Sequence, residues 1–522
     1  MTTRHRARVR MRRMSRMSRM SQRWIGGSAR GAALGLALWS ATILCAGAAQ
    51  AYDPATTHAG LTERAVLASD LHRALSRRLS RPLGLFEPVV LRRADLPGGE
   101  ARTLGGRLDA LDPAGGYRPS ADGVAPALAW IVAGTVIAET PAERGQNMFF
   151  DPTRGNGLAQ AGGVFGMENG VRTLFDTAGL RGAATGTSFN LTGRPSPEWL
   201  LAPENDVGLK VFYDQLEQAV AGELPGPRGT ALARALLALG GTLAVLEDAG
   251  EPAHVRNDFR AAYLNSGGAS PFDRGSLFER YVAETFGRTG VPAAGAPVNR
   301  PTVMAYLTAA DRQGLADRTQ RRFFSDGTLP EDGIVDRDTT GAEVMRDARQ
   351  SLAYGLPALP HLDLRGLGDK RYVYASAEAD RSVGGAPPLK RRRLLAYLRV
   401  PGRVRFFLDG NVYGDTARTL LPEIGAYGAG LINHLFRAEI RLDLTANAVA
   451  VSVTDPRGDL RRGEVRLYAE DATGRRQPMA TTPAGTTPTS FTIPVGTRRI
   501  AAVLRGEDAA GELVAVAEQP VR

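Results

Sequence analysis

The sequence predicts a mainly α-helical domain followed by a small β-sandwich, with a cleavable leader in front. Apolar residues recur at helical spacing from Tyr52 to about Arg437, and apolar and polar residues alternate after Arg437. An arginine-rich stretch and then an apolar stretch precede Tyr52. With 522 residues, 43% of them hydrophobic, the chain is long enough for two or more domains with ordinary globular cores.

Residues 1–51 have the layout of a signal peptide. Their arginine-rich start is followed by an apolar run over residues 32–44 and by Ala49-Gln50-Ala51, the small-x-small pattern at which signal peptidase cuts. The apolar run is shorter than the roughly 20 residues that span a bilayer. We therefore expect a secreted or periplasmic protein whose mature chain starts near Tyr52 and keeps no transmembrane helix after cleavage.

The basic charge of the chain is concentrated in this leader. The formal net charge is +11, and residues 1–51 contain ten arginines and no acidic residue, so 11 less 10 leaves +1 for residues 52–522. That balance gives no strong nucleic-acid signal, because an extended basic track is absent from the sequence. Cys45, the only cysteine, also lies in the leader. Chemistry in the mature chain must then use histidines, carboxylates, hydroxyls or a metal.

The predicted helical domain comprises residues 52–436. Helical spacing is clearest in two series of apolar residues, Leu61, Val66, Leu67, Leu71 and Leu75, and Leu232, Leu236, Leu239, Leu243 and Leu246. Stretches rich in glycine and proline at 96–126, 265–275 and 291–301 are expected to be loops between the helices.

The predicted β domain comprises residues 437–522. Apolar and polar residues alternate at 440–444, 449–453, 465–467, 491–495 and 502–504. Turn signals follow at 455–456, 473–474 and 510–511. Short strands separated by such turns most simply form an immunoglobulin-like β-sandwich.

The segment LEDAGEPAHVRNDF, residues 246–259, contains two candidate functional residues. A helix that ends near Ala249 places Asp248 in its last turn, and Pro252 turns the chain before His254. Both side chains can therefore face one cleft, as half of a metal site would require. The structural alternative is that Asp248 only hydrogen-bonds His254 or caps the turn.

This segment resembles the core of the zinc-dependent phospholipase C and S1/P1 nuclease superfamily, where a His, an Asp four residues on and a second His six further form the pattern. Other stretches resemble the superfamily in the expected order: YDPATTHAGLTERAV (52–66), GTVIAETPAERGQNMFFDP (134–152), GSLFERYVAE (275–284) and YGAGLINHLFRAE (427–439). The resemblance covers most of 52–439 and implies a phospholipase C/P1 nuclease-like helical domain before the β-sandwich.

The resemblance also implies a set of site residues. The implied metal ligands are Tyr52 through its freed α-amine, His58, Asp248 as a bridging ligand, His254 and Glu279. Glu139 occupies a carboxylate position usually held by Asp and is expected to act as a base or to orient a water. Three positions that should hold imidazoles carry Met148, Ala244 and Gly275 instead.

These replacements predict a reduced metal complement. The superfamily pattern implies three zinc ions, whereas a thioether is a poor zinc ligand and a methyl group is none. Because zinc sites need three or four ligands, we expect one or two zinc ions at most.

The expected function is that of a secreted phospholipase C-like protein with a degenerate active site. Its ancestral chemistry is metal-dependent hydrolysis of phospholipids or other phosphodiesters, with activity reduced or lost. Whether the protein is an enzyme stays open at this stage. The alternative is a non-catalytic secreted binding or surface module, and a nuclease-like enzyme ranks third because the mature chain lacks aromatic residues interleaved with arginines.

Overall fold

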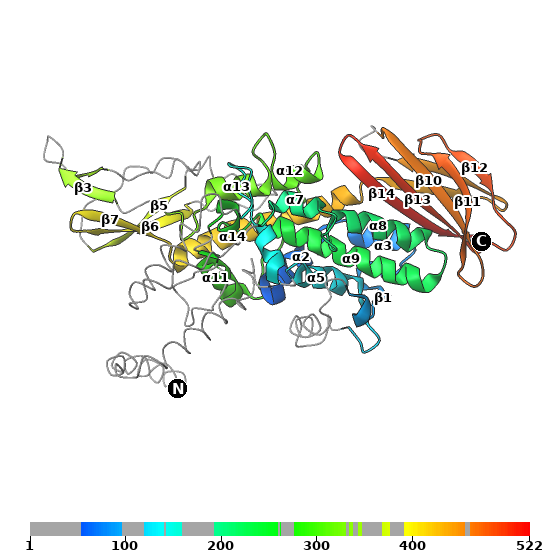
Figure 1. Cartoon of the computed structure of the whole chain (residues 1–522), viewed down its shortest axis with the longest axis horizontal. Helices are drawn as coiled ribbons and strands as arrows, with labels where there is room; N and C mark the ends of the chain where they lie inside the picture. Colours follow the sequence, from blue (N-terminus) through cyan, green and yellow to red (C-terminus); the bar gives the residue numbers. More distant parts are fainter. Residues whose placement is uncertain are drawn as a thin grey trace, which may run out of the picture. The chain divides into compact units, whose positions relative to one another are not determined.

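The structure is a computed structural model (Figure 1). It describes residues 54–96, 119–139, 142–158, 193–258, 261–262, 276–329, 333–337, 343–346, 368–375, 391–454 and 460–521. The predicted signal peptide and Tyr52 lie outside the described residues.

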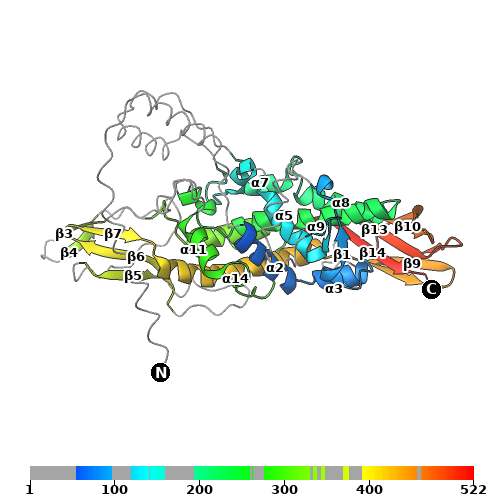
Figure 2. The same cartoon turned by 90° about the horizontal axis from the view of Figure 1, so that it is seen from below.

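Two apolar helices form the centre of the helical part. α5 (Ala127–Ala138) is buried along its whole length, and α9 (Pro225–Asp248) is buried from Ala231 to Asp248 except at Arg234. The two helices lie side by side (Figure 2). Because neither has a polar face, both need helices on several sides, as expected for core helices.

The other helices pack around this pair. They are α2 (Ala59–Ala68), α3 (Leu71–Arg78), α7 (Ser196–Leu201), α8 (Leu209–Ala221), α11 (Leu277–Phe286), α12 (Val303–Leu307), α13 (Leu315–Arg322) and α14 (Gly410–Leu435). Short helical turns precede or join them: η2 (Pro54–His58), η3 (Gly84–Phe86), η4 (Arg93–Asp95), η5 (Ala142–Met148) and η7 (His254–Arg256). α8 contacts α9, and α2 contacts α14, so one apolar core runs through the helical part.

By length and hydropathy alone, α9 could also cross a membrane. In the structure 83% of its apolar window is buried against the rest of the chain. That burial accounts for its apolar composition without a membrane.

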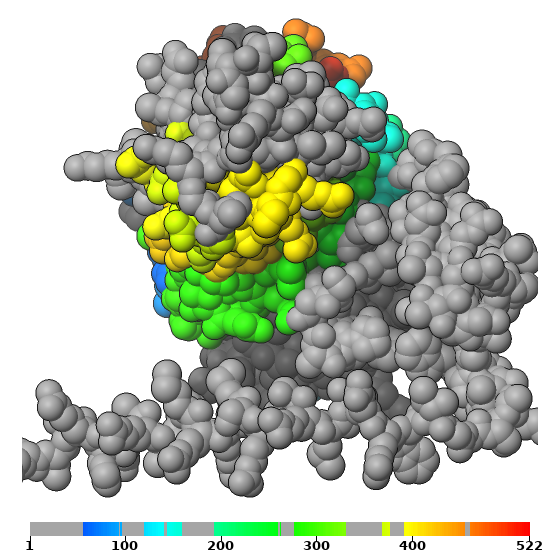
Figure 3. Space-filling model, turned by 90° about the vertical axis from the view of Figure 1, so that its left-hand side faces the viewer, coloured from blue at the N-terminus to red at the C-terminus, as the bar shows by residue number. Residues whose placement is uncertain are grey.

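A five-stranded antiparallel sheet separates α13 from α14 in the sequence and differs from the helical pattern predicted for this region. Its strands are β3 (Gly333–Arg337), β4 (Glu343–Arg346), β5 (Lys370–Tyr374), β6 (Arg393–Val400) and β7 (Arg403–Phe407), in the order β4-β3-β7-β6-β5. The sheet has its own small core around Leu395 and Val404. Its residues lie at the surface beside the green helical segments in Figure 3. Several strands have only four or five residues, too few to distinguish a period of two from a helical period.

The chain changes from helix to strand between Leu435 and Glu439, and a C-terminal β domain follows as predicted. Its strands are β8 (Glu439–Leu444), β9 (Ala448–Thr454), β10 (Arg462–Glu470), β11 (Arg476–Pro483), β12 (Thr489–Thr492), β13 (Arg499–Asp508) and β14 (Gly511–Pro520). They form antiparallel sheets in the orders β11-β10-β13-β14 and β12-β9-β8. A separate two-stranded sheet pairs β1 (Pro88–Val90) with β2 (Val124–Pro126) in the helical part.

One apolar core joins the two C-terminal sheets. It includes Ile440 and Val451 from one sheet and Leu467 and Leu504 from the other. The alternating apolar residues of β8 and β9 therefore form a buried face, as the sequence pattern predicted. Val495 is an exception: β12 ends at Thr492, and Val495 is fully exposed rather than inward-facing. The immunoglobulin-like topology stays a prediction.

Buried polar contacts join the β domain to the helical part. Arg437, just after α14, donates two hydrogen bonds to the Asp508 carboxylate, at 2.7 and 2.9 Å. Tyr213 of α8 donates to the Glu512 carbonyl at 3.0 Å. Both Arg437 and Asp508 are almost fully buried, so the two charges compensate each other at the junction.

Candidate metal centre

Two buried groups of histidine and carboxylate side chains meet at the end of α9. The first contains His58, Glu139 and Asp248, and the second contains Glu251, His254 and Glu279. Within each group, one nitrogen or oxygen atom from every residue lies within 4.8 Å of the others. The residues come from distant parts of the sequence, so the tertiary fold brings them together.

In the first group, His58 lies between carboxylates. Its Nε2 is 3.1 Å from Glu139 Oε1 and 3.2 Å from Asp248 Oδ1. On the other side of the ring, Nδ1 is 2.6 Å from Glu247 Oε2. Thr62 donates its hydroxyl to Glu247 Oε1 at 2.6 Å, which holds that carboxylate in place. Glu247 thereby fixes the His58 ring with Nε2 directed at the group.

The close contact between α5 and α9 positions the two carboxylates of this group. Glu139 is the C-terminal cap of α5, and Asp248 is the last residue of α9. A Cβ atom at Gly240 would come within 1.9 Å of the Ile131 carbonyl, and one at Gly134 within 2.2 Å of the Leu237 carbonyl. Only glycine permits the two backbones to approach this closely, so the separation of the helices depends on both residues.

In the second group, the His254 ring is held by the segment after α5. His254 Nδ1 donates to the Met148 carbonyl at 3.4 Å, and the ring stacks on Phe149 with centroids 4.0 Å apart. A carbonyl only accepts hydrogen bonds, so Nδ1 is the nitrogen that carries the proton. Nε2 then presents its lone pair toward Glu279 Oε1, 3.8 Å away.

The two carboxylates of this group are fixed by Ser276. Ser276 and Glu279 form a capping box at the start of α11: the Ser276 N–H donates to Glu279 Oε2 at 2.7 Å, and the Glu279 N–H donates to Ser276 Oγ at 3.1 Å. The Ser276 hydroxyl in turn donates to Glu251 Oε1 at 2.8 Å. Glu251 Oε2 accepts a hydrogen bond from the backbone N–H of His254 at 2.8 Å. This arrangement leaves Glu279 Oε1 facing His254.

Burial shifts the titration of the whole cluster. Burial raises the pKa of Asp248 to about 7 and that of Glu251 to about 8, and burial together with the nearby Glu251 raises the pKa of Glu279 well above its usual value. Burial lowers the pKa of His254 to about 3, so its imidazole is neutral. Burial would also lower the pKa of His58, but Asp248 and the other carboxylates outweigh it and hold that pKa well above 6.5.

These properties fit a bound divalent cation. Asp248 Oδ2, His254 Nε2 and Glu279 Oε1 are buried atoms that make no hydrogen bond with the described residues. Lone pairs that face one another without a donor are unfavourable unless a proton or a cation lies between them. Metal-binding histidines usually donate the other ring N–H to a carboxylate or a carbonyl, as His58 and His254 do. The nitrogen and oxygen donor set is one that zinc accepts.

The expected site residues are distributed as follows. His58 and Asp248 lie together, and Glu139, expected as a base, lies beside them in a position suited to a ligand. His254 and Glu279 lie together in the second group. The two groups interact electrostatically, because the charge of Asp248 in the first group contributes to the raised pKa of Glu279 in the second.

Of the three positions where the superfamily pattern expects an imidazole and this chain carries another residue, two are described. Met148 and Ala244 are both buried among apolar residues. Tyr52 and Gly275 lie outside the described residues. The Met148 backbone still contributes to the site, because its carbonyl accepts the hydrogen bond from His254.

Glu247 and Glu251 are functional candidates that the sequence pattern did not identify. Both occur in the quoted segment 246–259, but carboxylates are common at helix ends and neither matches a ligand position of the superfamily. A usable signal was present for Ser276 and Glu279, since Ser-x-x-Glu before an apolar run is a capping box. That motif predicts a fixed Glu279 carboxylate without indicating what it faces.

Comparison with known proteins adds little to this geometry. No protein-family model matches the sequence, and no curated protein matches it. Among solved structures, the alpha toxin from Clostridium absonum aligns with 91% of this chain and 100% of its own chain, at a TM-score of 0.24 and 8% identity. A TM-score this low does not establish a shared fold.

Proposed function

We propose that the protein is a secreted or periplasmic phospholipase C-like protein that binds one or two zinc ions and whose ancestral chemistry is phosphodiester hydrolysis. The observation that carries this proposal is the convergence of His58, Glu139 and Asp248, and of Glu251, His254 and Glu279, into two buried groups. Four separate stretches that resemble the superfamily contribute these residues in the superfamily's order.

Each residue has a distinct role in the proposed centre. His58, Glu139 and Asp248 would hold one ion, and His254 and Glu279 would hold the other with Glu251 as the third ligand. Glu247 orients His58, and the Met148 carbonyl orients His254. When bound, zinc supplies Lewis-acid polarisation of a phosphoryl group and activation of a water.

The number of available ligands supports a reduced rather than a full metal complement. Each group offers three ligand atoms, the number that a catalytic zinc site uses. Replacement of the imidazoles by Met148 and Ala244 leaves a set dominated by carboxylates. Glu139 completes a set of three with His58 and Asp248, and Glu251, which matches no ligand position of the superfamily, adds a third ligand to His254 and Glu279.

Burial of the centre favours the second candidate function, a non-catalytic binding or surface module. His58, Glu139, Asp248 and His254 each have 0% exposure. A phosphodiester cannot reach such a group without movement of the surrounding chain. In this alternative the metal stabilises the fold, and the β domain provides the functional surface. A nuclease-like activity ranks third because the mature chain has little net positive charge.

Zinc content and activity of the exported protein test the proposal. N-terminal sequencing should locate cleavage at Tyr52, and elemental analysis should return one or two zinc ions per chain. Turnover of phosphatidylcholine, of a generic phosphodiester and of single-stranded DNA should be measured with and without added zinc. We expect slow or no turnover of the first two substrates and none of the third.

Asp248→Asn provides the matched variant. It should abolish the zinc-dependent increase in melting temperature, whereas Asp122→Asn, at an exposed position, should leave it unchanged. Three tightly held ions would contradict the reduced complement. Absence of zinc from both the purified and the zinc-dialysed protein would contradict the metal centre itself. Rapid hydrolysis of DNA would favour the third candidate function.

A further inference from the structure

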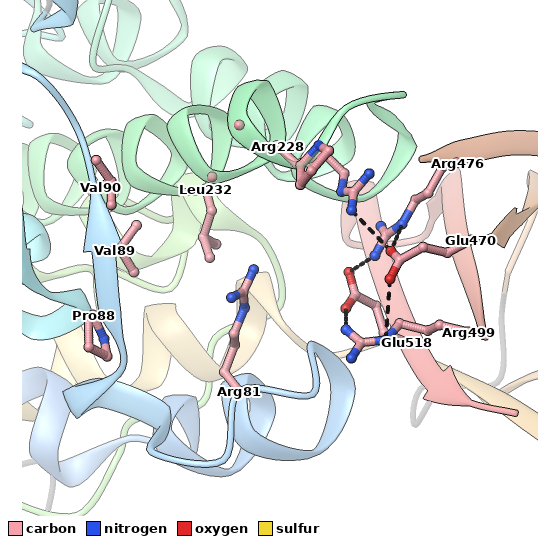
Figure 4. Close-up of a pocket in the computed structure, with 13 residues that line it drawn as sticks. Arg81, Pro88, Val89, Val90, Arg228, Leu232, Glu470, Arg476, Arg499 and Glu518 are labelled. Carbon is pink, nitrogen blue, oxygen red and sulfur yellow. Dashed lines mark hydrogen bonds and ion pairs between the residues drawn. The ribbon is translucent and has the colours of Figure 1, made fainter. Parts of the chain in front are cut away.

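A pocket of about 340 Å³ lies at the start of α9, between the helical part and the β domain (Figure 4). Its volume lies within the range of small-molecule sites. It is separate from the metal centre, because Arg228 in this pocket and Asp248 are 20 residues apart on one helix, or about 30 Å.

One side of the pocket is a network of arginines and glutamates. Glu470 accepts hydrogen bonds from Arg228 at 3.0 Å and Arg476 at 2.8 Å. Glu518 accepts from Arg476 at 2.7 Å and Arg499 at 3.0 Å. Arg228 and Arg476 are nearly buried. Burial, and then the charge of Arg476, lower the pKa of Arg228, which reflects crowding of like charges.

Arg81 adds a cation that this network does not compensate. Its side chain extends toward the middle of the pocket, between Val89 and Glu518 (Figure 4). It makes no side-chain hydrogen bond or ion pair with the residues that the structure describes, whereas the two glutamates are already engaged by other arginines. With four arginines and two glutamates, the lining has a formal charge of +2, since 4 less 2 is 2.

The backbone holds Arg81 in this position. Ser80, the preceding residue, adopts a left-handed conformation with φ of 48°, which is uncommon for a residue other than glycine. Its hydroxyl donates to the Glu518 carbonyl at 2.9 Å. The turn is thus fixed to β14, and the Arg81 side chain is presented to the pocket rather than directed along the surface.

The start of α9 leaves space for a ligand. Gly226 and Gly229 line the pocket, and a Cβ atom at either position would meet nothing within 4 Å. Glycine at such positions costs about 0.5–1 kcal/mol of helix stability relative to alanine. Gly226 also lies in the first turn, where backbone N–H groups lack helical partners and the helix dipole favours an anion.

The opposite wall is apolar. Val89 and Leu232 are already buried by the chain itself, whereas Pro88 and Val90, on either side of Val89 in β1, are exposed. An ion alone would not contact this wall. A ligand with a short hydrocarbon group could cover it while its charged end meets Arg81.

We propose that this pocket binds a small amphiphilic anion, in which a phosphate or carboxylate head group contacts Arg81 and the start of α9 while a short apolar tail covers the exposed Pro88 and Val90. The site is independent of the metal centre and of any hydrolytic activity. A phosphate or carboxylate head group occurs both in small free anions and in short-chain lipid fragments. Probes with and without a hydrocarbon chain distinguish these two sources.

Calorimetric titration of the full chain tests the proposal. Measurements in the presence of a chelator prevent phosphate from binding at the metal centre. Inorganic phosphate, hexyl phosphate and hexanoate are the probes, at low ionic strength. We expect hexyl phosphate to bind about tenfold more tightly than inorganic phosphate, the effect of burying roughly two methylene groups.

Variants then locate the site. Arg81→Gln should weaken binding of hexyl phosphate at least about tenfold, because it removes a charged hydrogen bond. Arg77→Gln, which removes the same charge from an exposed position on α3, should have no effect. Gly229→Leu should abolish binding by filling the open space while the melting temperature is maintained, which separates loss of the site from misfolding.

Two results would overturn the proposal. One is the absence of any heat of binding with hexyl phosphate and hexanoate at millimolar concentration. The other is binding that persists unchanged in both Arg81→Gln and Gly229→Leu. Failure of zinc binding in the experiments on the metal centre would leave these outcomes unaffected, so the two proposals fail independently.

Discussion

The buried carboxyl groups predict that the metal-free protein loses stability as pH rises from 6 to 8. A group whose pKa is raised by folding contributes stability that is present below its unfolded pKa and is lost as pH rises to the folded pKa. The pKa of Asp248 rises from 3.8 to about 7 and that of Glu251 from 4.5 to about 8. The stabilising contributions of both groups to the folded state therefore decrease within this pH interval.

The magnitude follows from these values. Each pH unit over which only the folded state holds the proton costs about 1.4 kcal/mol. Between pH 6 and 8, only the folded state holds the proton over about one pH unit for Asp248 and about two pH units for Glu251. His254, whose pKa falls from 6.5 to about 3, gains stability as pH rises, but only up to about 6.5. These three groups together give a loss on the order of 3 kcal/mol, and His58 and Glu279, whose pKa values are also raised, act in the same direction.

Urea unfolding of the chelator-treated protein, followed by far-ultraviolet circular dichroism at pH 6, 7 and 8, measures this loss. Zinc should reverse the trend, because its ligands must be deprotonated and its stabilisation therefore grows with pH. Between pH 6 and 8, Glu251→Gln should lose about 3 kcal/mol less of its free energy of unfolding than the natural protein loses, because a neutral amide does not titrate. A stability that is constant or rises with pH in the metal-free protein, or a slope unaffected by Glu251→Gln, would refute the reasoning.

Three further predictions concern the supports of the centre. Gly240→Ala should lower the free energy of unfolding by about 1–3 kcal/mol and weaken zinc binding, because the added methyl group would push α5 away from α9. Gly229→Ala on the same helix should be neutral or stabilising. Equal effects of the two substitutions in chemical denaturation would contradict the packing argument. Glu247→Gln should weaken zinc affinity about 10–100-fold without changing the number of bound ions, as measured by competition with a chelating dye. An unchanged affinity would show that Glu247 does not orient His58. Arg437→Met should cost about 3–5 kcal/mol, because the buried Asp508 carboxylate would lose the arginine that compensates its charge. A calorimetric loss below about 1 kcal/mol would show that the junction is not stabilised by this pair.

The sequence predicted α9 well, because its apolar series extends from Leu232 to Leu246. It also predicted the change from helix to strand near Arg437, where the period of the pattern changes clearly. The five-stranded sheet was not predicted: strands such as β3 and β4 are too short for a reliable period, and β6 has consecutive buried residues instead of alternation. The exposure of Val495 depends on where β12 ends, which alternation alone does not determine.

For the candidate site, the sequence supplied residue types and order, whereas the fold supplied the partners. His58, Asp248, His254 and Glu279 could be proposed from their resemblance to superfamily positions. Glu251 could not, since its relation to Ser276 and His254 exists only after the chain folds. Close packing of Gly134 against α9 is likewise a property of two helices and leaves no local signal.

Anomalous diffraction at the zinc absorption edge, from crystals grown with zinc, tests the metal centre most directly. The expected result is a peak within bonding distance of His58 Nε2 and Asp248, with or without a second peak at His254 Nε2 and Glu279. Peaks confined to the surface, or a zinc-soaked crystal with no peak at either group, would contradict the proposal that these buried side chains bind metal.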